Sequence, residues 1–239
     1  MTFSTLKSGQ LTIGASDFDA RPMTYVEDGQ RLGYEPDVAR AVCAKLGLQP
    51  VWLNLPMMDF YKTLQANKCD VVWFNQAITE ERLSHSHFTR PYGLFNEAII
   101  VRADGNIQSA ADLNGLKLGG LADSTNIELG EQFNGVELVP FPGSDQVLPE
   151  MLAALRAKKI DALVDDELVL ITAAEADPTL RIAFTVETQH RFAIALRPED
   201  ETLLTALNQA LDQLEADGTL QKLWEQWIPW RPFPFTQSA

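Results

Sequence analysis

The feature of this sequence that most constrains its fold is a seven-residue segment that occurs twice. Leu64-Gln-Ala-Asn-Lys-Cys-Asp70 and Leu155-Arg-Ala-Lys-Lys-Ile-Asp161 share leucine, alanine, lysine and aspartate at equivalent positions. Each copy follows a segment of helical period and runs into an apolar stretch, Val-Val-Trp-Phe in the first case and Ala-Leu-Val in the second. Because both copies occupy the same helix, turn and strand context, the repeat predicts two lobes of similar build.

Short apolar runs alternate with segments of helical period along the whole chain, which is typical of an α/β protein with mainly parallel sheets. We predict strands at residues 11–14 and 71–74 and helices at residues 36–46 and 57–64. In the first helix, Val38, Val42 and Leu46 lie on one face, and Gly47 is the expected end.

Two further strand-like segments, residues 97–102 and 191–197, roughly bracket the second copy of the repeat. If both are crossovers, lobe 1 comprises residues 1–97 plus 192–239, and lobe 2 comprises residues 98–191. Leucines at helical spacing in residues 203–214 then pack back on lobe 1. Small-molecule sites tend to form between two such lobes, so we expect the ligand there.

Composition excludes several partners. The formal charge of −14 argues against nucleic acid or an anionic membrane surface as a partner, and no apolar run approaches the roughly 20 residues of a membrane helix.

The first ten residues lack the basic start and apolar core of a signal peptide. Either the protein is cytoplasmic, or this is a mature segment without its signal. We expect a monomer.

Neither catalysis nor a cofactor is indicated. The chain has no GxxxxGK[ST], GxSxG or HExxH motif, and we expect no cofactor. His85 and His87 precede Phe88 as polar loop residues, so we expect them in solvent and not on a metal. Cys43 and Cys69 lie in no metal-ligand spacing; we expect two buried thiols, with one disulfide as the alternative.

A different set of residues points to a family. Thr79-Glu-Glu-Arg82, followed after five residues by Phe88-Thr-Arg-Pro-Tyr92, resembles the T-x-x-R and F-[ST]-x-P-Y signature of family 3 solute-binding proteins, the amino-acid receptors of ABC importers. Four further matches stand in the expected order: Leu6 to Gly14, Gly33 to Ala39, Asp112 to Gly119 and Asp217 to Trp227. The resemblance spans nearly the whole chain. It implies the type II periplasmic-binding-protein fold, with two α/β lobes joined by two hinge strands.

The resemblance also assigns ligand contacts. It implies that Arg82 binds the α-carboxylate of the ligand. This role suits arginine, because a planar guanidinium group binds a carboxylate bidentately. It implies that Asp166 binds the α-amino group, with Asp165 as the alternative if the match to the family motif is shifted by one residue. It also places the Ser124-Thr125 pair near the carboxylate, with Thr125 the stronger candidate. The ordinary alternatives are a surface arginine and helix-capping side chains.

This sequence departs from the family pattern in its ligand side-chain pocket. Ala77 stands where the family usually has a hydroxyl, so one hydrogen bond is absent or comes through Asn75. Ala20 and Met57 replace aromatic residues, although Phe18 is able to restore one wall. Asp17 occupies a position that contacts the ligand side chain in the preferred register. Asp19 and Arg21 pair with each other or with a charged ligand.

The resemblance therefore implies an extracytoplasmic or periplasmic protein that binds a polar L-amino acid in the cleft between the lobes and delivers it to an ABC permease. Because a carboxylate accepts hydrogen bonds, Asp17 favours side chains with donors, such as those of Gln, Arg, Lys or His. Arg21 turned inward would instead favour Glu or Asp. Two other uses of the same fold stay open: the ligand-sensing ectodomain of a receptor, and an enzyme similar to cyclohexadienyl dehydratase.

Overall fold

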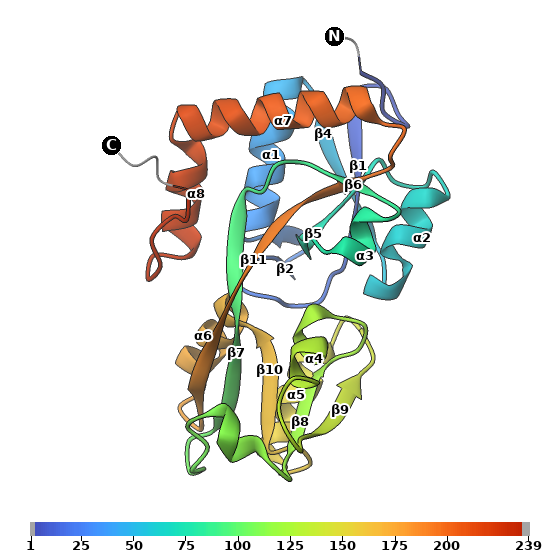
Figure 1. Ribbon diagram of the computed structural model, residues 1–239. Coiled ribbons are helices and arrows are strands. Elements are labelled where there is room, and N and C mark those ends of the chain that lie inside the picture. The colour runs from blue at the N-terminus through green and yellow to red at the C-terminus, as the bar shows by residue number, and fades with distance from the viewer. Residues whose placement is uncertain (1–2, 236–239) are drawn as a thin grey trace. The chain divides into compact units, whose positions relative to one another are not determined.

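The computed structural model of the protein describes residues 3–235, which form two compact units (Figure 1). Unit 1 takes the residues up to Asp17, Met23–Leu94 and the residues from His190 onward; unit 2 takes Phe18–Pro22 and Phe95–Gln189. The chain thus changes unit within strands β7 (Gly93–Arg102) and β11 (Leu180–Leu196). The ends of the predicted first lobe, residues 1–2 and 236–239, lie outside the described residues. Phe18–Pro22 groups with unit 2, whereas the sequence prediction gives all of residues 1–97 to the first lobe.

Unit 1 is built on a sheet in which β1 (Gln10–Ala15) runs parallel to both β4 (Gln49–Asn54) and β5 (Val71–Ala77). The carboxyl-terminal part of β11 pairs antiparallel with β5, and β6 (His87–Phe88) pairs with β11. A separate hairpin consists of β2 (Tyr25–Glu27) and β3 (Gln30–Leu32). The helical elements of this unit are α1 (Tyr34–Leu46), η1 (Met57–Asp59), α2 (Phe60–Gln65), α3 (Glu80–Leu83), α7 (Glu201–Ala216) and α8 (Thr219–Trp227).

The predicted elements of unit 1 are confirmed, with small changes at their ends. Helix α1 buries Val38 and Val42, and it ends at Gly47, whose φ of 67° is the left-handed conformation that terminates helices. The predicted helix at residues 57–64 is a short 3₁₀ turn, η1, followed by α2. Helix α7 buries Leu203, Leu207 and other apolar residues on one face. It packs on α1, as the leucine spacing predicts.

Unit 2 repeats this architecture. Its strands follow the order β7, β10 (Ala162–Asp166), β8 (Lys117–Leu121) and β9 (Glu137–Phe141). Strand β8 is parallel to β9 and β10, whereas β7 is antiparallel to β10. Its helical elements are η2 (Ala110–Leu113), α4 (Thr125–Gly130), α5 (Val147–Arg156) and α6 (Glu167–Ala176). A core of buried apolar residues joins the sheet to η2 and α4: Ile99, Val101, Leu113, Leu118, Leu129, Ala162 and Val164.

The two copies of the repeat adopt one conformation. Asn67 and Lys158, the fourth residues of the two segments, both have positive φ values, of 54° and 59°. The closing aspartates behave alike as well, because Asp70 N–H donates to the Thr12 carbonyl and Asp161 N–H donates to the Lys117 carbonyl, each at 2.8 Å. Each turn is therefore joined to the neighbouring parallel strand by the same backbone hydrogen bond.

Two arginines complete this equivalence. Arg197 follows β11 and donates from Nη1 to the carbonyls of Leu64 and Cys69, at 3.1 and 2.6 Å. Arg102 ends β7 and donates from Nη1 to the carbonyls of Leu155 and Ile160, at 2.9 and 3.0 Å. Each unit thus fastens its copy of the repeat to the end of a long strand through one guanidinium group.

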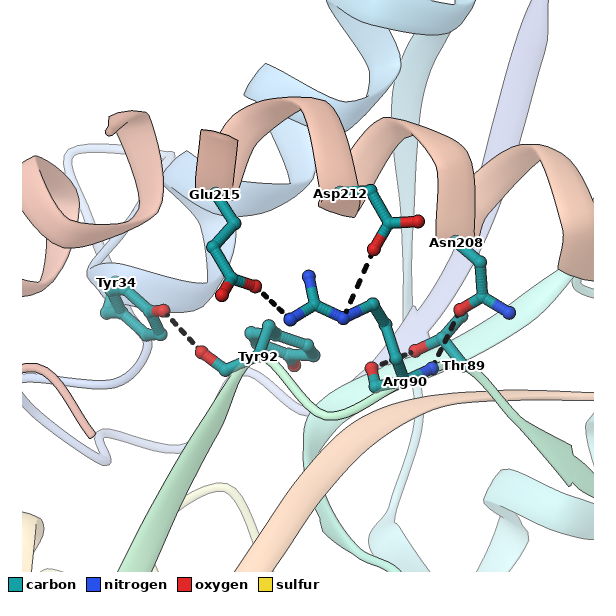
Figure 2. Close-up of polar contacts among 7 residues, drawn as sticks. All are labelled: Tyr34, Thr89, Arg90, Tyr92, Asn208, Asp212 and Glu215. Carbon is teal, nitrogen blue, oxygen red and sulfur yellow. Dashed lines mark hydrogen bonds and ion pairs between the residues drawn. The ribbon is translucent and has the colours of Figure 1, made fainter. Parts of the chain in front are cut away.

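The motif Phe88 to Tyr92 connects the sheet of unit 1 to α7 (Figure 2). Arg90 forms ion pairs with Glu215 and with Asp212, the latter at 3.4 Å from Nε to Oδ1. Its backbone N–H donates to Asn208 Oδ1 at 2.7 Å. All three partners lie on α7, so this segment holds the helix against the start of β7.

Candidate functional site

The predicted ligand residues of unit 1 gather at the carboxyl ends of two neighbouring strands. Because β1 and β5 are parallel, with Ile13 opposite Val71, their ends meet at one edge of the sheet. Asp17 follows β1, Asn75 and Ala77 end β5, and Arg82 lies on α3 just beyond. In open α/β sheets this edge is where ligands bind.

Arg82 is oriented by its own local structure. Thr79 caps α3 by accepting the Arg82 backbone N–H at 3.2 Å. Arg82 Nη1 donates to the Ala77 carbonyl at 2.9 Å, and the guanidinium carbon lies 5.9 Å from the centre of the Tyr61 ring. Burial raises the pKa of Tyr61 to about 12, although Arg82 lowers it. One of the five guanidinium N–H donors is thus directed at the protein.

Ala77, Asn75 and Met57, which the sequence analysis assigns to the ligand pocket, also lie on this side. Ala77, which stands where the family usually has a hydroxyl, is buried and contributes its carbonyl to Arg82. Asn75 has a φ of 46° and donates its backbone N–H to Glu35 Oε2. Met57 is half-buried in η1, directly before α2.

Asp17 has a partner that sequence reasoning missed. Its carboxylate forms an ion pair with Arg31, whose side chain is only 4% exposed, and its N–H donates to Asn54 Oδ1 at 2.9 Å. The Arg31 guanidinium also donates to the Ser16 carbonyl and lies 5.1 Å from the Trp52 ring centre. Arg31 thus balances the negative charge of Asp17. No motif marks Arg31, because its position depends on the β2–β3 hairpin.

The segment after Asp17 carries the other charged pair. Arg21 Nε lies 2.9 Å from Asp19 Oδ2, and both side chains are 44% exposed. These two residues therefore pair with each other, one of the two alternatives that the sequence leaves open. Phe18, the candidate aromatic wall, is buried.

The predicted residues of unit 2 also lie at the carboxyl ends of parallel strands, β8 and β10. Ser124 caps α4, accepting the Ile127 N–H at 3.4 Å and donating to the Leu121 carbonyl at 2.7 Å. Thr125 is the first residue of that helix. Asn126 Nδ2 donates to Asp165 Oδ1 at 2.7 Å, so the start of α4 is fastened to the end of β10.

Asp165 and Asp166 have different surroundings. Asp166 is 3% exposed and caps α6 by accepting the Leu168 N–H at 2.7 Å. Asp165 accepts the Asp166 N–H at 2.8 Å. Burial raises the pKa of Asp165 to about 6, the Asp166 N–H lowers it and Glu97 raises it.

Glu97 lies directly across the sheet from Asp166 and is fully buried, with Thr188 donating to it. Asp166 and Glu97 are therefore opposite each other on neighbouring strands, and Asp165 precedes Asp166. Sequence reasoning missed Glu97, which belongs to no motif and is brought there by strand pairing.

Residues 3–235 include no cluster of three or more His, Cys, Asp or Glu side chains able to hold a metal ion. Over the same residues, no helix has the length and apolar character needed to cross a bilayer. Cys43 and Cys69 are buried free thiols, as expected, and burial raises their pKa values to about 12 and 11.

Comparison with known families gives one match over most of the chain. Residues 11–229 match the model described as bacterial extracellular solute-binding proteins, family 3. The ABC transporter arginine-binding protein 1 of Escherichia coli is 28% identical over 204 residues, which are 83% of this chain and 82% of that protein. The histidine-binding periplasmic protein of Salmonella typhimurium is 28% identical over 207 residues, 82% of this chain and 78% of that protein.

Solved structures agree with the sequence comparison. An ancestral arginine-binding protein bound to glutamine is similar with a TM-score of 0.86 and 28% identity, covering 93% of this chain and 99% of that one. The fold of both units together with their connecting strands is thus shared with amino-acid-binding proteins.

Proposed function

Because this chain belongs to family 3 of the bacterial extracellular solute-binding proteins and has the type II periplasmic-binding-protein fold, we propose that it binds a polar L-amino acid and delivers it to the permease of an ABC importer. It acts outside the cytoplasm as a monomer, and it performs no chemistry on its ligand. The relatives named above are binding proteins, which supports this reading.

The observation that carries the proposal is the setting of Arg82. Its guanidinium group is held by the Ala77 carbonyl at the edge of the sheet where β1 and β5 end. A planar cation in that position suits a bidentate carboxylate. In the proposal Arg82 binds the α-carboxylate, with Thr125 and Ser124 of unit 2 contributing further hydrogen bonds.

The ammonium group is proposed to bind at Asp166, where Asp165 and Glu97 add negative character. Neighbouring carboxylates favour a cation at this position.

For the ligand side chain we propose a group with N–H donors. Arg31 neutralises Asp17 but leaves its carboxylate able to accept further hydrogen bonds. Arg21 is paired with Asp19, which weakens the case for an acidic ligand. Relatives named for arginine and histidine, and one bound to glutamine, have ligands with such donors.

A thermal-shift panel of the twenty amino acids tests the ligand class. Ligand at 100 times its Kd adds about 2.7 kcal/mol to the free energy of unfolding, which for a chain of 239 residues is roughly 5–10 °C in Tm. We expect shifts with Gln, Arg, Lys or His. Shifts restricted to Leu, Ile, Val or Phe would refute the Asp17 argument, and no shift at all would favour the receptor or enzyme alternatives.

Calorimetry on Arg82→Ala tests the anchor. Removing the partner of a desolvated carboxylate costs about 2–5 kcal/mol, or roughly 30-fold to several thousand-fold in Kd. Arg82→Lys keeps the charge without the planar fork, so it should fall between Arg82→Ala and the wild type. The matched control is Arg156→Ala, which removes an exposed arginine paired with Asp177 in unit 2 and should leave Kd unchanged. Arg82→Ala binding within threefold of wild type would rule out this role.

A further inference from the structure

The strand that leads to Arg82 is interrupted by a bulge. Two residue pairs of β5 and β11 are in register on each side of it: Ala77 with Phe192 and Gln76 with Ala193 on one side, and Val72 with Ala195 and Val71 with Leu196 on the other. The three residues from Trp73 to Asn75 thus lie opposite Ile194 alone. A bulge takes residues out of the hydrogen-bonded ladder, and Asn75 has a left-handed φ of 46°, a conformation that asparagine tolerates. The backbone N–H groups that the bulge removes from the ladder need acceptors outside the strand.

Glu35 supplies that support. It is the second residue of α1, and it is 1% exposed. Its Oε2 accepts the backbone N–H of Asn75, and its Oε1 accepts the hydroxyl of Tyr92. A buried backbone N–H left without an acceptor is strongly disfavoured, so the carboxylate stabilises the bulge directly.

The bulge is close to the proposed ligand contacts. Asn75 lies two residues before Ala77, whose carbonyl accepts Arg82 Nη1 at 2.9 Å. Tyr92, the other partner of Glu35, directly precedes β7, and its own carbonyl accepts the Tyr34 hydroxyl at 2.8 Å. Glu35 therefore joins the end of β5 to the base of β7.

Building on the proposed function, we propose that Glu35 is a positioning residue of the binding site, because its carboxylate holds the Asn75 bulge that sets the place of Ala77 and Arg82. It acts through the Asn75 backbone. Relaxation of the bulge would move the carbonyl that orients the Arg82 guanidinium group.

The charged and titratable groups that face Glu35 set its pKa, and its titration makes the contact with Asn75 observable. Burial raises the pKa of Glu35 to about 7, whereas Tyr92, the Asn75 N–H and Arg31 lower it. Burial, together with Glu35 itself, raises the pKa values of Tyr34 and Tyr92 well above 10. Glu35 is thus the group in this network that titrates near neutral pH, and the Asn75 amide proton should report its titration.

The first measurement is the ¹H–¹⁵N resonance of Asn75 between pH 5.5 and pH 8.5 in the ligand-free protein. We expect it to move with a midpoint near pH 7 in the wild type and to stay constant in Glu35→Gln. An Asn75 resonance with the same chemical shift in the wild type and in Glu35→Gln at every pH would show that Asn75 does not contact the Glu35 carboxylate, and would overturn the inference even if Glu35→Ala cannot be folded.

The second measurement is calorimetric binding of L-arginine, L-histidine and L-glutamine to three variants. Glu35→Ala leaves the Asn75 N–H without its acceptor and should weaken binding about tenfold or more. Glu35→Gln retains an acceptor oxygen and should stay within about threefold of wild type.

Asp70→Ala is the matched control, because Asp70 is equally buried and accepts the Leu6 and Thr12 N–H groups at 2.7 Å at the other end of β5. It should lower stability without changing Kd. Equal losses of affinity in Glu35→Ala and Asp70→Ala would show that Glu35 affects binding only through the stability of the fold, and would overturn the inference. If the wild type binds none of the three amino acids, the proposed function fails, and the Asn75 resonance alone decides whether Glu35 holds the bulge.

Discussion

Asp166 has a structural role as a helix cap and a proposed role in ligand binding, and single substitutions are able to separate the two. Its carboxylate caps α6 through the Leu168 N–H, and it lies opposite the buried Glu97 on the neighbouring strand. The cap needs only a side-chain oxygen, which asparagine also offers. The proposed ammonium contact needs a negative charge. A neutral side chain of the same shape therefore distinguishes the structural role from the binding role.

We predict that Asp166→Asn leaves the free energy of unfolding unchanged or raises it, because one of several neighbouring carboxylates loses its charge. The same variant should weaken binding of α-amino acids about tenfold or more, and should do so less for analogues without the ammonium group. Asp166→Ala should lose about 1 kcal/mol of stability as well. Urea denaturation and calorimetry give the two quantities, and unchanged affinity in Asp166→Asn would reduce the residue to a cap.

At the level of elements, the long strands β7 and β11 each end near an arginine that fastens the repeated turn. Arg197 is 6% exposed, donates to two buried carbonyls, and lies 2.6 Å from Asp200. Arg102 makes the equivalent carbonyl contacts, but its side chain is 19% exposed and its carboxylate partners are 3.8 Å away. The arginine that holds the repeated turn is thus more deeply buried in unit 1 than in unit 2.

Replacement of each arginine by methionine should reveal this difference. Arg197→Met leaves carbonyls and Asp200 without their cation and should cost about 3–4 kcal/mol, whereas Arg102→Met should cost about 2 kcal/mol. Lys117→Met, which removes a 49%-exposed partner of Glu137, should cost less than about 0.5 kcal/mol. Urea midpoints give the ranking, and a loss for Arg102→Met that equals or exceeds that for Arg197→Met would contradict it.

These arginines also show where prediction from sequence ends. The repeat itself was readable, because its helix, turn and strand are contiguous and its residues recur at fixed positions. The guanidinium groups that hold it lie 53 and 133 residues from their carbonyl partners, so no local pattern indicates them. The same reason hides Arg31 beside Asp17 and Glu97 opposite Asp166. Arg82 and Asp166 are predicted as ligand contacts because they stand in recognisable motifs, whereas residues placed by strand pairing have no such signal.

For the whole molecule, the buried acidic groups and the net charge both lower the free energy of unfolding as the pH rises toward neutral. Each unit holds a buried carboxyl with a raised pKa, namely Glu35 at about 7 and Asp165 at about 6. The formal charge of −14 at neutral pH adds repulsion that declines toward the isoelectric point near 4.6. Asp177 and Asp217, two carboxylates whose pKa values are lowered to about 2, lose their contribution only below about pH 4.

We therefore predict that the free energy of unfolding decreases as the pH rises from 5 to 7.5. Between the unfolded and folded pKa values of Glu35, about 4.5 and 7, the folded state binds more protons, so stabilisation present at low pH is lost as the pH rises through 7. The shift at Glu35 corresponds to on the order of 3 kcal/mol. Urea denaturation at the two pH values measures it, and 0.5 M salt screens the contribution of net charge. In salt, Glu35→Gln should remove most of the remaining decrease of the free energy of unfolding with pH, since an amide does not titrate. An unchanged decrease in that variant would show that Glu35 is not its source.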